Sequence, residues 1–581
     1  MNILVLVKPV VEAKDIKFNS DMTLDRSHAI PSIDMADAHA ISLARNLLKE
    51  KKGTLVLLTL SPGYPTPLIA QFRSYDANAV YQISDRLFAG SDSLMTAKIL
   101  AAGIRYLEHS YGKFDRILAG VRSTDAETGQ VPSEIAALMS RPVVSNVVSM
   151  DGHTMARLLE DRSLLMVGEG AFVVSCCPKG YCLDPPSLTG MAHASFVPYI
   201  LLTNKELGLA PNDVGLKGSP TRVIGTSLGI QSWRKPVWTD DPKIGASWIR
   251  EAVRQIQSKG KRIDTAEAIR LPAKKLGTPV FVMAPLFDVV GWGCAMEIMS
   301  SLALQGKDPV CIAVGDSFSD AFSEEANTSG ACRVVFLHQE LSSDDAVYGC
   351  TIAAYFKGKS GIVLAPATIR MRSILPYAAA LLHVGLTADC TGYAFEDDAF
   401  IQIRPAFEGT SQARIVTKGA LVFSTVRPHV YVKRQFAPLF PFSVETVENK
   451  GNSSAFTVEK EEPTGFASDG QERVVMSIGA GIMDLGLRDR ITRLGYRLGA
   501  SRKAVNLFGI PYAYQIGQTG MIIHADLYVA FGISGAAQHI TGISAVKEII
   551  AVNPDRKAPI FQFSDKAICC KAEEVIGYLE Q

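Results

Sequence analysis

The sequence predicts an α/β protein made of two parallel-sheet modules and a third, smaller α/β region, and three observations support this prediction. Residues 1–200 alternate short β-branched runs with helical patterns. The same alternation restarts near residue 276 and occurs again beyond residue 472. With 581 residues the chain is too long for one hydrophobic core, so a division into about three domains is expected.

The first module begins with short apolar runs bounded by turn or polar residues, which are typical of buried strands. These runs are Ile3–Val7, Thr54–Leu60 and Arg116–Ala119. Between the first two runs, apolar residues recur at helical spacing, namely Ile41, Ala44, Leu47 and Leu48. Lys49, Lys51 and Lys52 follow at the C-terminus of this predicted helix, where the helix dipole favours cations. Strand, helix and strand in this order predict a parallel sheet with both faces covered.

The second module repeats this layout. Its strand candidates are Pro279–Met283, Pro309–Ala313, Arg333–Leu337 and Gly361–Ala365. The segments that begin at Arg116 and at Gly361 also share one order, which is an apolar strand, a polar loop, a proline (Pro132 or Pro376), an Ala/Leu-rich helix and a second short strand. The same order in two places indicates duplicated folds.

Two stretches have the composition of connections. Residues 204–277 mix Gly/Pro-rich sequence with one amphipathic helix around Ile244–Gln257. Glu445–Gln471 is rich in Ser, Glu and Gly and has little periodicity, which predicts a flexible linker. The third region follows it, with strands expected at Arg473–Ile478, Leu527–Ile533, Glu548–Val552 and Ile560–Phe563.

Composition and charge exclude several classes of function. A net charge of +1 gives no field that would attract nucleic acid or anionic lipid, and no apolar run reaches the ~18 residues of a membrane span. The start, MNILVLVKPV, lacks the basic region and cleavage site of a signal peptide. The cysteines include no Cys-x-x-Cys, and the adjacent pairs Cys176-Cys177 and Cys569-Cys570 suit neither metal ligation nor an ordinary disulfide. We therefore expect free thiols, no metal and a cytoplasmic protein.

Turns that contain glycine, a hydroxyl or Asn-Pro gather in the third region, next to predicted strands or helices. They are GASR (Gly499–Arg502), GQTG (Gly517–Gly520), GISGAAQH (Gly532–His539) and VNPD (Val552–Asp555). Glycine lets backbone N–H groups approach a bulky anionic ligand, and Ser or Thr supplies short hydrogen bonds. GISGAAQH joins a strand end to an Ala-rich helix, which suits a pyrophosphate. Each turn alone could be an ordinary tight turn, but together they favour a nucleotide site.

These turns carry a family resemblance. The tail from Leu498 onward reads GASR, IGQTG, LYVAFGISGAAQH, AVN and APIFQFSD, and it resembles the FAD domain of the electron transfer flavoprotein α subunit in order and spacing. GLTADC (Gly385–Cys390), RPAF (Arg404–Phe407) and TVRP (Thr425–Pro428) are similar to the N-terminal module of that subunit. Residues 1–225 resemble the β subunit, with VKPV near the start, the loop Asp125–Pro132 and GLKGSPT. The resemblance implies a β and an α subunit fused in one chain.

The resemblance also implies a fold and a function. The fold would comprise two adenine-nucleotide-hydrolase-like modules and a C-terminal FAD-binding domain, and the protein would carry electrons without a catalytic residue of its own. The expected divisions are a β-subunit-like nucleotide-binding module at 1–225, a fusion linker with a helix at 226–275, an α-subunit-like module at 276–444, a flexible linker at 445–471 and the FAD domain at 472–581.

The roles of residues at the flavin follow from the same resemblance. Thr519 is similar to the hydroxyl that bonds flavin N5. His539 is similar to the histidine beside flavin O2, where a positive or hydrogen-bonding group favours the negative charge that develops at N1–C2=O2. Arg502 would add positive charge near the ring. The cofactor-binding set is completed by Ser501, Gly517, Gln518, Ser534, Gly535, Ala536, Ala537, Gln538, Asn553 and Asp565.

Other interpretations of these residues stay open. His539 could be a histidine on a helix surface, and Arg502 could form an ion pair at a helix start. The family usually has GGRG after the first strand of this domain, whereas Ala480 takes the place of that arginine here. Losing this cation should make the flavin harder to reduce.

The first module contains weaker sequence evidence for a second nucleotide site. The resembling β-subunit pocket holds AMP in ordinary members, and in the bifurcating branch it holds a second FAD that meets NADH. The loop TDAETGQVPSEIA has the length of the bifurcating pattern but keeps the TGQ of the AMP type, so both stay open, and a solvated acidic loop is the plain alternative. The expected residues are Leu6, Asp34, Asp37, Asp125, Thr128, Gly129, Gln130 and Val131.

PPSLTGMAHASF (Pro185–Phe196) is similar to the β-subunit loop that docks onto acyl-CoA dehydrogenases, with Leu188 as the anchor and Met191 beside it. The family's lysines after this loop are absent, and an ordinary buried loop is the alternative. The implied donor is an acyl-CoA dehydrogenase or a similar flavoprotein dehydrogenase, and the implied acceptor is a quinone oxidoreductase or a ferredoxin. The competing functions are a bifurcating, NADH-oxidising form with two FADs and a nucleotide-binding sensor without redox function.

Overall fold

A computed structural model of the chain describes residues 1–10, 17–18, 24–25, 31–63, 66–177, 185–228, 234–258, 278–396, 399–406, 411–449, 454–463, 473–482, 486–510, 514–517, 520–521, 523, 525–544 and 546–581. The chain forms two compact units. Unit 1 consists of Met1–Thr226, Glu267–Phe407 and Ala413–Pro463, and unit 2 consists mainly of Ser227–Ala266 and Thr464–Gln581. Among the helices of the described residues, none has the length and apolar character needed to cross a membrane.

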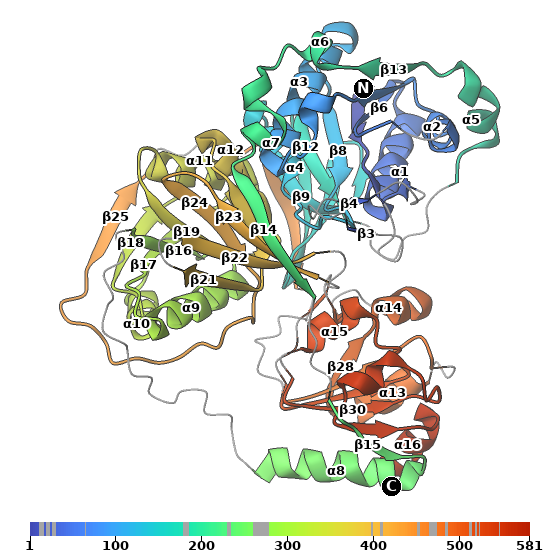
Figure 1. The fold of residues 1–581 in the computed structure, drawn as a ribbon, viewed down its shortest axis with the longest axis vertical. Coiled ribbons are helices and arrows are strands. Elements are labelled where there is room, and N and C mark those ends of the chain that lie inside the picture. The colour runs from blue at the N-terminus through green and yellow to red at the C-terminus, as the bar shows by residue number, and fades with distance from the viewer. Residues whose placement is uncertain are drawn as a thin grey trace. The chain divides into compact units, whose positions relative to one another are not determined.

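The first module of unit 1 is built on a 10-stranded sheet with the order β13-β7-β6-β1-β8-β12-β9-β10-β11-β26 (Figure 1). Its parallel strands are β13 Tyr199–Leu202, β7 Ala79–Ile83, β6 Thr54–Leu60, β1 Asn2–Leu6, β8 Arg116–Gly120, β12 Phe172–Cys176 and β9 Val143–Asp151. Three antiparallel strands extend it, namely β10 Thr154–Leu158, β11 Arg162–Gly168 and β26 Phe456–Pro463. One face carries α1 Met35–Glu50 and α2 Thr66–Arg73, and the other carries α3 Ser93–Tyr111 and α4 Val131–Leu138.

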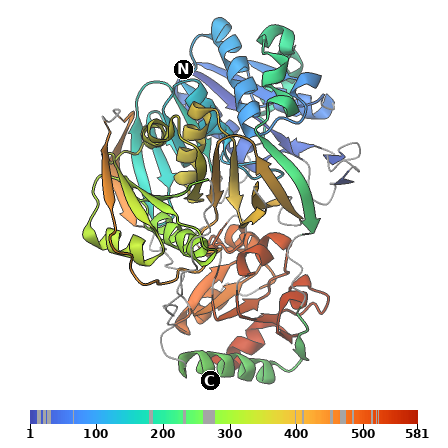
Figure 2. The same cartoon turned by 60° about the vertical axis from the view of Figure 1, so that its left-hand side comes forward.

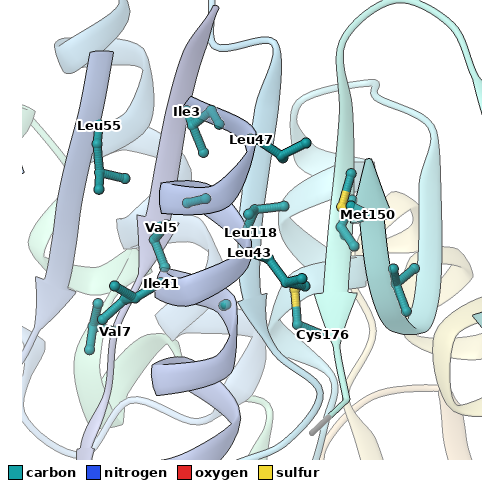
Figure 3. Packing of buried hydrophobic residues seen from close by; sticks show 14 of the residues in the cluster. Ile3, Val5, Val7, Ile41, Leu43, Leu47, Leu55, Leu118, Met150 and Cys176 are labelled. Carbon is teal, nitrogen blue, oxygen red and sulfur yellow. The ribbon is translucent and has the colours of Figure 1, made fainter. Parts of the chain in front are cut away.

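The core of this module forms because strand alternation and helix periodicity bring apolar side chains to the same layer. Ile3, Val5 and Val7 alternate along and just beyond β1, so they share one face of the sheet. Apolar side chains of α1 pack against this face, as Figure 3 shows. The buried residues labelled there are Ile3, Val5, Val7, Ile41, Leu43, Leu47, Leu55, Leu118, Met150 and Cys176.

The second module of unit 1 has a 7-stranded parallel sheet with the order β20-β24-β19-β16-β17-β18-β25. Its strands are β20 Leu386–Cys390, β24 Leu421–Val426, β19 Gly361–Pro366, β16 Val280–Pro285, β17 Val310–Gly315, β18 Arg333–His338 and β25 Val444–Glu448. Its helices are α9 Val289–Leu304, α10 Asp320–Thr328, α11 Asp345–Phe356 and α12 Met371–Leu382. A smaller sheet combines β14 Thr221–Leu228, β23 Ser411–Thr417, β22 Ala399–Ala406 and β21 Gly392–Glu396.

The two modules of unit 1 are duplicates that pack on each other through corresponding helices. The order of strand, loop, proline-containing helix and strand occurs as β8–α4–β9 and as β19–α12–β20, as the sequence predicts. α4 packs on α12, and Ser133 Oγ lies 2.9 Å from Ser373 Oγ in the buried contact. Asp345 is fully buried in the same interface, where Arg157 donates to its Oδ2 at 2.6 Å and Arg370 to its Oδ1 at 3.0 Å.

Unit 2 is a parallel sheet with the order β15-β31-β30-β29-β27-β28. Its strands are β15 Val237–Thr239, β31 Lys566–Ile568, β30 Glu548–Val552, β29 Leu527–Phe531, β27 Val474–Ile478 and β28 Arg497–Ala500. The predicted fusion segment supplies both β15 and α8 Pro242–Ser258 to this unit. α8 packs beside the C-terminal helix α16 Ala572–Leu579, as Figures 1 and 2 show in green and red. The other helices are α13 Leu487–Arg493, α14 Arg502–Phe508 and α15 Ala537–Ile543.

The structure corrects two sequence predictions. Glu445–Gln471, expected to be a flexible linker, contains most of β25 and all of β26. β26 is an edge strand with Phe456 buried and the rest of its side chains exposed, so its charged sequence has no apolar alternation to reveal it. Ile560–Phe563, expected to be a strand, lies in the 3₁₀ turn Pro559–Phe563, because Pro559 fixes a helical φ at its start, and the strand is β31 instead.

Candidate functional site

The sheet of unit 2 has a topological switch point between β27 and β29. From β27 the chain goes to β28 on one side, and it then returns to β29 on the other side. In open parallel sheets, ligands bind in the crevice at the carboxyl ends of the strands that flank such a point. Gly532–Gly535 of the predicted GISGAAQH turn follows β29, and a further glycine-containing turn, Gly479–Gly481, follows β27, so both lie there.

Close backbone approach requires glycine in these turns. A Cβ on Gly479 would lie 2.1 Å from Gly532 O, and a Cβ on Gly535 would lie 2.2 Å from Ile560 N. Gly535 also has a φ of +87°, a conformation that residues with a side chain rarely adopt. Gly481 N donates to Gly532 O at 3.0 Å and ties the two turns together. Glycine at these places therefore lets the turns pack closely on each other and on Ile560, and the N–H groups of Gly479, Gly481 and Gly532 donate within the protein.

Gly517, the first residue of GQTG, lies against the first residues of α15. A Cβ on Gly517, whose φ is +137°, would lie 2.8 Å from Gln538 O. Gly520 N donates to Gly517 O at 2.9 Å. Gln518 and Thr519 lie outside the described residues, so the expected role of Thr519 at flavin N5 stays a prediction.

His539 is buried on α15, with 5% of its surface exposed, and the interpretation as a surface helix histidine is therefore wrong. Its Nε2 lies 2.7 Å from the Oη of Tyr528 on β29. Its Nδ1 has no partner of good geometry among the described residues, but the backbone of Ile516 lies close enough to hydrogen-bond the ring. Burial lowers the pKa of His539 to about 4, and the backbone carbonyl of Ile516 opposes this shift only in part. The ring is thus a neutral hydrogen-bonding group at neutral pH, without the positive charge of an imidazolium.

The remaining predicted residues at this end of the sheet differ in exposure. Ser501 caps α14 and its Oγ accepts from Ala504 N at 3.3 Å, while Arg502 is exposed as the first helical residue. Ala480 is half-buried directly after Gly479, where the family has its arginine. The GISG turn and the start of α15 expose Ser534, Ala536 and Ala537 and half-bury Gln538.

Asn553 and Asp565 make contacts within the protein. Asn553 is buried and its Nδ2 donates to Ile533 O at 2.9 Å, which supports the GISG turn from the neighbouring strand end. Asp565 Oδ2 accepts from Ile549 N at 2.8 Å and pairs with Arg234 of the fusion segment. Their contribution to a bound cofactor stays a prediction.

In the first module, Asp34 and Asp37 hold the carboxyl ends of β1 and β8 to α1. Asp34 Oδ1 caps the helix, and its Oδ2 accepts from Thr124 N at 2.8 Å. Asp37 accepts from Lys8 N at 2.6 Å and from Gly120 N at 2.9 Å. Burial and the neighbouring Asp34 raise the pKa of Asp37 to about 8. Both side chains thereby fix the shape of the loop that follows β8.

Asp125, Glu127 and Gln130 of this loop are buried and its other residues are half-buried, so the interpretation as a solvated acidic loop is wrong. Asp125 accepts from Lys8 Nζ at 2.5 Å. Gln130 is 1% exposed and accepts from Ser93 Oγ at 2.7 Å, while its Nε2 donates across the module interface to Leu386 O at 3.4 Å. The other expected residues are also placed there, with Leu6 buried and Thr128, Gly129 and Val131 half-buried.

Sequence reasoning missed a buried ion cluster beside this loop. Asp389 accepts from Arg372 and Arg427 at 2.5 Å each, and these arginines outweigh burial and hold its pKa well below the usual range. Arg404 Nη2 donates to Ala126 O at 2.8 Å. Burial raises the pKa of Glu127 to about 7, although neighbouring arginines lower it. GLTADC, RPAF and TVRP supply Asp389, Arg404 and Arg427, but only the family resemblance marked these motifs.

The segment around α5 (Leu188–His193) is held firmly and points apolar side chains outward. Ser187 Oγ accepts from Gly190 N and donates to Asp76 Oδ1, both at 2.8 Å. Leu188 is 82% exposed, and Met191 and Phe196 are 50% and 79% exposed, so the alternative of an ordinary buried loop is wrong. Phe196 was not predicted as a docking residue, although an aromatic residue at the end of a Pro-bounded loop could have indicated it.

Comparisons with known proteins agree with this architecture. A family model described as "Electron transfer flavoprotein domain" matches residues 21–170 and 297–461, and one described as "Electron transfer flavoprotein FAD-binding domain" matches residues 470–544. The electron transfer flavoprotein subunit alpha of Paracoccus denitrificans is 30% identical over 269 residues, which are 44% of this chain and 84% of that protein.

Two further relatives extend the comparison. The corresponding alpha subunit of Thermoanaerobacterium thermosaccharolyticum is 34% identical over 233 residues, 38% of this chain and 70% of that protein. The acryloyl-CoA reductase electron transfer subunit beta of Anaerotignum propionicum is 30% identical over 306 residues, 45% of this chain and 83% of that protein. Within the described part of the chain, no group of three or more His, Cys, Asp or Glu side chains could hold a metal ion.

Proposed function

Since the chain belongs to the electron transfer flavoprotein family, with β-type and α-type parts fused, we propose that it carries electrons between two redox proteins through an FAD held in unit 2. The observation that supports this most strongly is the switch point of unit 2. Two glycine-containing turns meet there at backbone distance, and His539 is buried on the helix that follows the second of them.

FAD fits the residues at this place. The GISG turn between β29 and α15 offers backbone N–H groups to a pyrophosphate, and the family resemblance places His539 beside the flavin. Bound FAD supplies reversible uptake of electrons. We propose that Arg502 and Thr519 complete the surroundings of the ring, with Ser501, Gly517, Gln518, Ser534, Ala536, Ala537, Gln538, Asn553 and Asp565 as the remaining binding residues. With Ala480 in place of the family's arginine, we expect the flavin to be harder to reduce.

Acid extraction of the purified protein tests this function. We expect a yellow protein that releases about one FAD per chain, and its bound flavin should be reduced by a flavoprotein dehydrogenase and reoxidised by a second redox protein. A colourless preparation that takes up no added FAD would contradict the proposal and favour the nucleotide-binding sensor. Flavin that is bound but exchanges no electrons with any dehydrogenase would contradict the carrier function alone.

We propose that the first module holds AMP as a structural ligand near Leu6 and the loop Asp125–Val131. The burial of this loop and the arginines beside it support an anionic ligand, because Arg372, Arg404 and Arg427 face Asp389 and Glu127. A second FAD is the alternative, and it would make the protein a bifurcating, NADH-oxidising enzyme. The loop length favours that alternative, so the same extract should be assayed for AMP, for a second FAD and for anaerobic reduction by NADH.

We propose that Leu188, Met191 and Phe196 dock into an apolar pocket of an acyl-CoA dehydrogenase or a similar flavoprotein dehydrogenase. This docking role is supported by the exposure of the three side chains on a segment that the hydrogen bond between Ser187 and Asp76 holds in place. Apolar anchors that are ordered before binding lose little conformational entropy when they bind. The acceptor would be a quinone oxidoreductase or a ferredoxin.

The division of the chain and its location also stay proposals. We retain a β-like module at 1–225, an α-like module at 276–444 and the FAD domain at 472–581, and we assign the fusion segment to the FAD domain because Ser227–Ala266 groups with it. Among the described residues no two cysteines are joined by a disulfide, which supports a reducing compartment such as the cytoplasm.

A further inference from the structure

Unit 1 has two topological switch points, one in each of its modules. In the first module the chain leaves β1 for β6 and β7 on one side and returns to β8 on the other side. In the second module it leaves β16 for β17 and β18 and returns to β19 in the same way. Open parallel sheets bind their ligands at the carboxyl ends of the strands that flank such a point. The duplicated fold therefore provides two corresponding places for a ligand in unit 1.

A carboxyl group of the first module lies at the second switch point, by which we mean the carboxyl ends of β16 and β19 with the residues that follow them. Glu160 lies in the turn between β10 and β11. Its Oε1 accepts from Ile369 N at 2.5 Å, and Ile369 lies in the loop 367–370 that follows β19. Asp288, which follows β16 and caps α9, is near enough to act on the charge of Glu160. The Glu160 carboxyl group therefore meets both sides of this switch point.

Contacts that do not involve the Glu160 side chain hold its turn against the second module. Leu159 N donates to Arg162 O at 2.8 Å and closes the turn. Arg157, on β10, donates to Asp345 of the second module at 2.6 Å, and both side chains are fully buried. Arg157 also donates to Ser343 O at 3.1 Å. The fold of the first module thus places Glu160 at the second switch point.

The two switch points differ in where their loops find hydrogen-bond acceptors. In the first module Thr124 N, in the loop 121–130 after β8, donates to Asp34 of the same module at 2.8 Å. The loop of the second module is much shorter, and its Ile369 N donates to Glu160 of the other module. A side-chain carboxyl group thus takes up a backbone N–H group where the topology predicts a ligand.

We propose that Glu160 is an internal ligand of the second module. Its carboxyl group fills the second switch point, so unit 1 has one switch point that accepts a nucleotide and not two. This role concerns unit 1 alone and does not depend on the FAD function proposed above. It goes beyond that function because it gives the contact between the two modules a task of its own.

The surroundings of Glu160 favour a protonated carboxyl group. Burial, and next the negative charge of Asp288, raise its pKa to about 8. Asp161 acts in the same direction, whereas the N–H of Ile369 lowers this pKa. The donors and cations that act on the two carboxyl groups include Thr368, Gly291, Arg370, Arg157 and Arg372. At neutral pH Glu160 therefore carries its proton, and glutamine is the residue that resembles it most closely.

The first test compares two variants of Glu160 in the full chain at pH 5. Unfolding in urea is followed through the ¹⁹F signal of labelled Trp292, which lies on α9 in unit 1 and is identified by its loss in Trp292→Phe. Glu160→Gln keeps an acceptor for Ile369 N and should leave the unfolding equilibrium unchanged. Glu160→Ala removes this acceptor, so we expect the unfolding constant to rise about tenfold. Equal stability of Glu160→Ala and the unmodified chain would overturn the proposal.

Acetamide tests whether the side chain fills the switch point as a ligand does, because this molecule has the same polar group as glutamine. Acetamide should raise the stability of Glu160→Ala towards that of Glu160→Gln, with saturation, and should not stabilise Glu160→Gln. The matched control is Glu461→Ala, which removes an exposed carboxylate that pairs with Arg162 and should not respond. No response of Glu160→Ala, or an equal response of the three variants, would overturn the filling role.

The pH dependence of stability gives a check that remains if Glu160→Ala does not fold. The folded chain holds the Glu160 proton more tightly than the unfolded chain, so the free energy of unfolding falls as the pH rises from 4.5 towards 8. Relative to Glu160→Gln, we expect the unfolding constant of the unmodified chain to rise about 50-fold between pH 5.5 and pH 7.5. A fall over this range would mean that Glu160 is charged and paired with an arginine, and would overturn the assignment.

Nucleotide content tests the number of open switch points. In equilibrium dialysis with labelled AMP, the FAD-loaded chain should bind at most one AMP. Two bound AMP molecules would overturn the proposal, because both switch points would then accept a nucleotide. A chain that binds none would contradict the AMP site proposed for the first module, while the Glu160 variants would still decide whether this side chain is an internal ligand.

Discussion

Replacing Glu127 by glutamine tests the electrostatics of the loop in the first module. Glu127 is 5% exposed, and burial raises the pKa of its carboxyl from 4.5 to about 7 even though neighbouring arginines lower it. The folded protein therefore holds this proton more tightly than the unfolded chain. Between pH 4.5 and 7 the unfolded chain loses the proton first, so the free energy of unfolding falls as the pH rises through this window.

The size of the effect follows from the shift. Each pKa unit corresponds to about 1.4 kcal/mol, so the loss by pH 8 is about 3 kcal/mol. Glutamine stays neutral at every pH. We expect Glu127→Gln to match the original protein at pH 4.5 and to be more stable by about 3 kcal/mol at pH 8.

Urea unfolding at several pH values measures this difference, because all other titrating groups are common to both proteins and cancel. A probe in unit 1 is needed, since the two units need not unfold together. If Glu127→Gln is less stable than the original protein at pH 8, the carboxylate is charged and paired with the arginines, and the reasoning is refuted.

Three further predictions address docking, the module interface and the glycine turns. The double variant Leu188→Ala, Phe196→Ala should raise the Kd for a dehydrogenase partner about 30-fold with unchanged FAD content. The control Leu216→Ala, at a 63% exposed site elsewhere, should leave this Kd unchanged, and equal affinity of the two variants would contradict docking. Asp345→Ala should lower the free energy of unfolding by about 3–5 kcal/mol in urea, because its two guanidinium partners lose their buried counter-charge, and a loss below about 1 kcal/mol would refute this. Gly535→Ala should weaken FAD binding, measured by flavin fluorescence, because φ is +87° and a Cβ has no room; full FAD retention would show that the turn tolerates a side chain.

Much of the fold could be predicted because buried parallel strands leave a continuous apolar run. Thr54–Leu60 has the same bounds in the prediction and in β6 for this reason. Ile560–Phe563 is also mainly apolar, although Gln562 interrupts it, but Pro559 before it turns the backbone into a 3₁₀ helix. β26 escaped prediction because an edge strand needs backbone partners rather than a buried face, and backbone pairing leaves no sequence signal.

Some residues of the candidate sites could likewise be predicted from the sequence, and others could not. Glycine turns such as Gly532–Gly535 could be found, because close approach and positive φ demand glycine at fixed places after a strand. Tyr528 could not, since an aromatic residue in a buried strand looks like ordinary core until its hydroxyl is seen to contact His539. The ion cluster around Asp389 was also invisible, because its partners come from separate elements.

The composition of unit 2 from two distant stretches of sequence has a consequence during protein synthesis. β15 ends at Thr239, whereas its partner strand β31 begins at Lys566. At roughly 10 residues per second, the ribosome takes about half a minute to make the chain between them. During this time α8 has left the ribosome with its apolar stripe, which includes Ile249 and Val253, and the sheet that will cover it has not yet been translated. The nascent protein must therefore shield this helix, by a chaperone or by provisional contacts, until the last residues emerge.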